Sequence, residues 1–123
     1  MTSVLLIVSA LLLAVWAIAH ALATRAVVVG FGEISQDNRR VVVMEWLNES
    51  LLLLFIAALL LVVAALGVDS TGSWVLVSCA VALNAMSVLS LFTGFRINFL
   101  PYRLCPVIFT GTSLLVIAAV LAA

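Results

Sequence analysis

Two glutamates one helical turn apart are the residues of this chain best suited to chemistry. Glu45 and Glu49 lie in the segment 45–49 (EWLNE), at the start of a long apolar run. Carboxylates at this spacing share one face of a helix and repel each other when both are ionised. Such a pair can relay protons, bind a cation, or act as acid and base on a substrate. The alternative is a static network in which each carboxylate pairs with Arg39, Arg40, Arg96 or Arg103.

His20 is the only histidine in the sequence. It cannot form a haem site with two histidine ligands, and a zinc site would need Glu45, Glu49 or Cys105 as further ligands. A lone histidine hydrogen-bonded to a neighbouring helix is the simpler interpretation, and we favour it. The sequence contains no glycine-rich phosphate loop, CxxC, HExxH or GxSxG motif. We therefore expect neither a resident metal nor another cofactor.

The two cysteines, Cys79 and Cys105, are expected to be small buried apolar residues. Cys79 should lie about a turn inside the outer leaflet, and Cys105 near the inner boundary. A disulfide needs the two Cα atoms within about 7 Å. We therefore predict two free thiols.

The elements that must position these residues are apolar throughout. Hydrophobic residues make up 67% of the 123 positions and charged residues only 8%, which is too little polar surface for a soluble domain. A helix crosses a hydrocarbon core with about 20 apolar residues. Four segments qualify: 4–23 with an extension to 29, 41–66, 74–92 and 104–121. The sequence predicts an all-α integral membrane four-helix bundle that forms a single domain over residues 1–123.

The arginines indicate the orientation of this bundle. Loop 24–40 holds Arg25, Arg39 and Arg40, and loop 93–103 holds Arg96 and Arg103. Because basic residues in short loops stay on the cytoplasmic side, we predict that both loops are cytoplasmic and both termini outside. A lack of lysine with abundant Ala, Val and Leu is typical of GC-rich bacterial genomes, so we expect a bacterial inner membrane. The lipid bilayer is the expected surrounding, and a net charge of zero gives no reason for a nucleic-acid partner.

Polar residues also follow one face of each later segment. Exposing such faces to lipid would be costly, so all should turn inward. In this orientation they gather with His20, Glu45 and Glu49 in the cytoplasmic half as a polar vestibule. The residues that we predict to bind a ligand there are Asn48, Asn84, Ser87, Arg96, Arg103 and Thr110.

A stripe of alanines marks one face of the first segment: Ala10, Ala14, Ala17 and Ala21. Small residues let helices approach closely in lipid. The stripe should meet another helix or a second copy of the chain, so we expect a homo-oligomer or a larger membrane complex.

The layout as a whole resembles a known architecture. A histidine lies late in the first helix, 45–49 (EWLNE) opens the second, and 93–96 (TGFR) leads to 100–106 (LPYRLCP). This order is similar to that of DoxX-like four-helix membrane proteins over the whole chain. The resemblance implies a compact four-helix bundle. It matches no motif residue by residue, so no functional residue is carried over from it.

Two functions remain open at this point. A polar interior without a recognisable catalytic constellation favours a non-enzymatic accessory subunit or a module that binds a small ligand or a lipid. The alternative is an intramembrane enzyme or a proton-coupled carrier that uses Glu45 and Glu49, with His20 as a proton partner. A cavity that reaches both glutamates would support function, whereas a dry, fully paired cluster would support a structural role.

Overall fold

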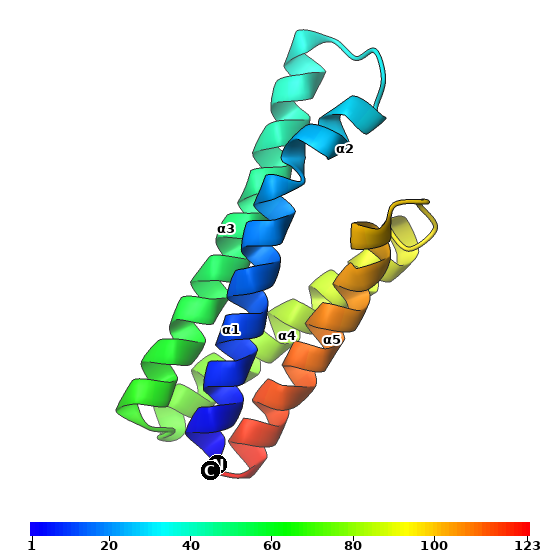
Figure 1. Cartoon of the computed structure of the whole chain (residues 1–123). Coiled ribbons are helices and arrows are strands. Elements are labelled where there is room, and N and C mark those ends of the chain that lie inside the picture. Colours follow the sequence, from blue (N-terminus) through cyan, green and yellow to red (C-terminus); the bar gives the residue numbers. More distant parts are fainter.

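The computed structural model describes residues 1–123 and consists of five helices (Figure 1). Four of them are long and apolar enough to span a membrane: α1 (Thr2–Leu22), α3 (Gln36–Leu66), α4 (Ser70–Thr93) and α5 (Leu100–Leu121). The fifth, α2 (Thr24–Gly30), is short. The predicted all-helical fold with four long apolar helices is confirmed.

The extension of the first segment is helical but separate from α1. Figure 1 shows α2 turning away from the axis of α1. The Thr24 hydroxyl donates a hydrogen bond to the carbonyl of Ala21 at this bend. Val27 and Val28 are buried, so α2 packs back toward α3. Helix α2 ends at Gly30, and Gly32 follows with a φ of 69°, a conformation that glycine adopts without strain.

All four long helices begin earlier than predicted, α1 by two residues and α4 by four. The Ser35 side chain accepts a hydrogen bond from the amide of Asn38 at 3.1 Å, so α3 begins at Gln36 rather than at residue 41. Helix α5 begins at Leu100 rather than at 104, with Pro101 in its first turn, where its missing amide proton has no partner. Pro106 lies inside α5.

The long helices form two pairs, α1 with α3 and α4 with α5, and α1 also packs against α5. Helices α3 and α4 follow each other in sequence, yet they contact each other little and diverge from their shared turn (Figure 1). Both termini lie at one end of the bundle, where the Thr2 hydroxyl donates to the carbonyl of Ala122 at 3.2 Å. The divergence of α3 from α4 therefore opens toward the opposite end.

The core between the helices is aliphatic, and Phe109 is its largest fully buried side chain. Ala10 and Ala17 of the alanine stripe are buried in this core. Ala14 and Ala21 are half-buried. The stripe thus serves packing within the chain and offers little surface to a second copy.

Candidate functional site

A cavity of about 550 Å³ lies between α3 and α4 at the end of the bundle opposite the termini. Its volume falls within the range of small-molecule sites. Its wall is formed by the four long helices α1, α3, α4 and α5 and by the loop between α4 and α5. The lining residues are His20, Glu45, Asn48, Glu49, Leu52, Met86, Leu89, Ser90, Thr93, Gly94, Ile97, Tyr102 and Cys105.

Helix α3 supplies three polar side chains to this wall. Glu45, Asn48 and Glu49 are three or four positions apart, which places them on one helical face. Glu45 and Asn48 are exposed, whereas the Glu49 side chain is 31% exposed. The hydrogen-bonding groups therefore run from an open rim at Glu45 to a more enclosed point at Glu49.

Neither glutamate pairs with an arginine. The chain has two ion pairs, one between His20 and Glu49 and one between Arg40 and Asp37. The alternative of a static network of glutamates and arginines is therefore wrong. The two carboxylates lie in a cavity whose lining holds no arginine.

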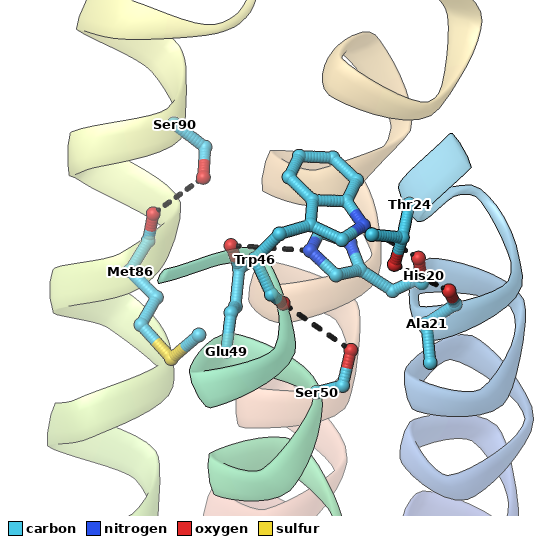
Figure 2. Close-up of polar contacts among 8 residues, drawn as sticks. All are labelled: His20, Ala21, Thr24, Trp46, Glu49, Ser50, Met86 and Ser90. Atoms are coloured by element: carbon cyan, nitrogen blue, oxygen red, sulfur yellow. Dashed lines mark hydrogen bonds and ion pairs between the residues drawn. The ribbon is translucent and has the colours of Figure 1, made fainter. Parts of the chain in front are cut away.

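Trp46 fixes the position of His20. The two rings stack with centroids 3.8 Å apart at an interplanar angle of 12°. The Trp46 indole Nε1 also donates a hydrogen bond of 2.6 Å to the backbone carbonyl of His20 (Figure 2). On its other side, Trp46 meets the ring of Tyr102 edge to face at 5.4 Å. Trp46 thus joins α1, α3 and α5 beside the cavity.

The imidazole of His20 is almost completely buried, with a side chain 1% exposed. Its Nε2 lies 3.4 Å from Glu49 Oε2, and Figure 2 shows Glu49 directed at the ring. This contact is too long for a charge-assisted hydrogen bond, which spans about 2.7–2.9 Å. Neither ring nitrogen has a hydrogen-bond partner. The prediction that His20 is hydrogen-bonded to a neighbouring helix is wrong for its side chain.

Cys105 completes a cluster with these two residues. One ligand atom from each of His20, Glu49 and Cys105 lies within 4.8 Å of the other two. Both cysteines are free and buried, as predicted, but Cys105 also lines the cavity. The three side chains come from three different helices. Because their ligand atoms lie close together, these three residues could hold a metal ion.

The other predicted ligand-binding residues lie outside the cavity. The Asn84 amide donates to Ser113 Oγ at 2.6 Å, and the hydroxyls of Ser87 and Thr110 are 2.7 Å apart. These contacts join α4 to α5. Arg96 and Arg103 are exposed, and Arg103 donates to the carbonyl of Ile97 at 3.3 Å.

The sequence predicted only two residues of the wall contributed by α4, its following loop and the start of α5: Ser90, expected in the polar cytoplasmic half, and Cys105, a possible metal ligand. Met86, Leu89 and Ser90 share a helical face, but their spacing resembles that of any packed helix. Tyr102 also lines the cavity. Its position in α5 could have been found only from the earlier start of that helix.

Comparisons with protein-family models, curated proteins and solved structures found no match to this chain. The resemblance to DoxX-like proteins therefore stays a prediction about architecture.

Proposed function

We propose that this protein is a non-enzymatic membrane module that binds a small amphipathic molecule with a cationic or hydrogen-bond-donating head. The observation that carries the proposal is the cavity of about 550 Å³, whose lining holds two carboxylates and no arginine. Glu45 has no ion-pair partner, and a free carboxylate at the rim of a site favours a cationic or proton-donating ligand.

The lining favours an amphipathic shape for this molecule. Leu52, Met86 and Leu89 supply apolar wall, whereas Glu45 and Asn48 supply acceptors at the exposed rim. A ligand that places its head at the rim and its apolar part between α3 and α4 would satisfy both surfaces.

The bundle is proposed to lie in a bacterial inner membrane with both termini outside and loops 24–40 and 93–103 in the cytoplasm. Support comes from the five arginines, all on segments at the end opposite the termini. A core of about 30 Å measured from Leu66 at about 1.5 Å per residue ends close to Trp46. Glu45 then lies at the cytoplasmic boundary and Glu49 about one turn inside, so the ligand enters from the cytoplasm or the inner leaflet.

A dansyl-labelled alkyl amine tests the proposal directly. We expect it to bind purified protein in mild detergent with EDTA present, while its neutral N-acetyl derivative binds at least about tenfold more weakly. Glu45→Gln should weaken amine binding by about tenfold, because it removes a charge at the rim but keeps the side-chain shape. Fluorescence titration measures both affinities.

Glu33→Gln is the matched control, because Glu33 is exposed in the loop before α3 and does not line the cavity. It should bind the amine like the unmodified chain. Equal affinity for the amine and its acetyl derivative, or equal weakening by both substitutions, would refute a site selective for cations.

The second candidate function is an intramembrane enzyme or a proton-coupled carrier. The contact of 3.4 Å between His20 and Glu49 favours it, because a histidine and a carboxylate at this separation can exchange a proton through a small movement. Because this contact involves Glu49, Glu49 rather than Glu45 would be the carboxylate that accepts and releases the proton.

A carrier would accumulate the dansyl amine in proteoliposomes when a pH gradient is imposed. Glu49→Gln should lower the initial uptake rate by about tenfold or more, because a neutral amide cannot take up the transported proton. Glu33→Gln should transport normally. Uptake equal to that of protein-free liposomes would reject the carrier and leave the binding module.

A further inference from the structure

All of the buried side-chain nitrogen and oxygen atoms without a hydrogen-bond partner lie on two residues of α1. They are Trp16 Nε1, His20 Nδ1 and His20 Nε2. A buried polar group without a partner costs about 1–3 kcal/mol. The Trp16 indole N–H has no acceptor. Two of the three unpartnered atoms thus belong to His20, a member of the cluster with Glu49 and Cys105.

We propose that His20, Glu49 and Cys105 form a zinc site at the enclosed side of the cavity. The distance between His20 Nε2 and Glu49 Oε2 is 3.4 Å. In a tetrahedral site with bonds of about 2.1 Å, ligand atoms are about 3.4 Å apart. A separation that is too long for a hydrogen bond therefore fits one edge of a zinc tetrahedron.

Cys105 lies within reach of the same point. Its ligand atom is within 4.8 Å of the other two, and the corresponding edges of a zinc site with one sulfur are about 3.6 Å. A side-chain movement of about 1 Å closes this difference. On binding, the thiol loses its proton to solvent and a zinc–sulfur bond forms.

The arrangement fits a metal better than a proton relay from thiol to histidine to carboxylate. In a relay, the thiol and the carboxylate contact opposite nitrogens of the imidazole. Here a single ligand atom from each residue converges with the other two. Convergence on one point leaves room for an ion at the centre.

The donor set selects zinc among common ions. Magnesium and calcium prefer oxygen ligands, and copper(I) prefers sulfur with little affinity for carboxylate. One nitrogen, one oxygen and one sulfur suit zinc. With an ionised Glu49 and a Cys105 thiolate, the divalent ion gives a neutral cluster, which lowers its cost at a buried position.

The neighbouring aromatic residues support the same assignment. Trp46 holds the His20 ring by stacking at 3.8 Å, which fixes the direction of Nε2. Zinc binding would give a partner to His20 Nε2, one of the three unpartnered atoms. The proposal stands on these contacts and does not depend on the amine ligand.

Cobalt(II) is the spectroscopic probe for the test. Protein purified in mild detergent and stripped with EDTA is titrated with Co²⁺ and then with Zn²⁺. We expect one equivalent of Co²⁺ to give a thiolate-to-cobalt charge-transfer band, and one equivalent of Zn²⁺ to remove it. Cys105→Ser should abolish the band, whereas Cys79→Ser, which replaces the other buried cysteine, should retain it.

Glu49→Gln keeps the thiolate and provides a second variant if Cys105→Ser does not fold. It should lower the zinc affinity by about tenfold or more while the protein stays monodisperse and helical. The proposal is overturned if no stoichiometric band forms, if the band persists in Cys105→Ser, or if Cys79→Ser alone removes it. Metal binding without amine binding would reject only the proposed function, and the reverse result would reject only the zinc site.

Discussion

Replacing Trp46 by alanine should lower the free energy of unfolding by about 3–5 kcal/mol. The side chain belongs to a residue only 8% exposed, and its loss leaves a cavity where three helices meet. It also removes the stacking on His20, the edge contact with Tyr102 and the hydrogen bond of 2.6 Å to the His20 carbonyl. Titration with a denaturing detergent, followed by circular dichroism, measures the change.

Two further tryptophan substitutions separate packing from hydrogen bonding. Trp46→Phe keeps an aromatic ring but loses the indole donor, so it should cost about 1–2 kcal/mol. Trp74→Ala is the matched control, because Trp74 is 73% exposed near the start of α4 and should change stability by less than about 0.5 kcal/mol. Equal losses for the Trp46 and Trp74 alanine variants would contradict a special role for Trp46 in joining α1, α3 and α5.

The helices could be predicted from the sequence because long apolar runs leave little choice of structure. Their limits were harder to predict, since they depend on single residues. Ser35 caps α3 and starts it within a polar stretch, where hydrophobicity gives no signal. Pro106 lies inside α5, although a proline in a helix interior usually ends or kinks the helix. At the bend between α1 and α2, the Thr24 hydroxyl donates a hydrogen bond to the Ala21 carbonyl, and hydrophobicity does not indicate this bend.

Part of the cavity could also be predicted. His20, Glu45, Asn48 and Glu49 follow from helical periodicity and from their shared depth along the helices. Asn84, Ser87 and Thr110 gave the same kind of signal, but they bond across the interface between α4 and α5. Periodicity identifies a polar face without showing which helix lies against it.

Cys105 shows a second limit of sequence reasoning. Its cluster with His20 and Glu49 joins three helices, and no local spacing links these residues. The same is true of Trp46, whose two aromatic partners lie on α1 and α5. Contacts of this kind depend on how the helix pairs diverge, which the order of apolar segments does not determine.

The proposed function requires that the cavity between α3 and α4 binds the ligand. A large side chain placed in this cavity tests that requirement most directly. Ser90 lines the cavity, is half-buried and donates a hydrogen bond of 2.8 Å to the Met86 carbonyl (Figure 2). Ser90→Trp would place an indole where the apolar part of the ligand is expected. We expect it to weaken binding of the dansyl amine by about a hundredfold or more, because the ligand loses both space and apolar contact.

Ser78→Trp is the matched control for this measurement. Ser78 lies on the same helix and makes the equivalent 2.8 Å hydrogen bond to the Trp74 carbonyl, but it does not line the cavity. The affinities of both variants and of the unmodified chain are compared by fluorescence titration in the same detergent, after circular dichroism has shown that each is folded. We expect loss of binding in Ser90→Trp and unchanged binding in Ser78→Trp. Unchanged binding in both variants, or equal loss in both, would contradict a ligand site between α3 and α4.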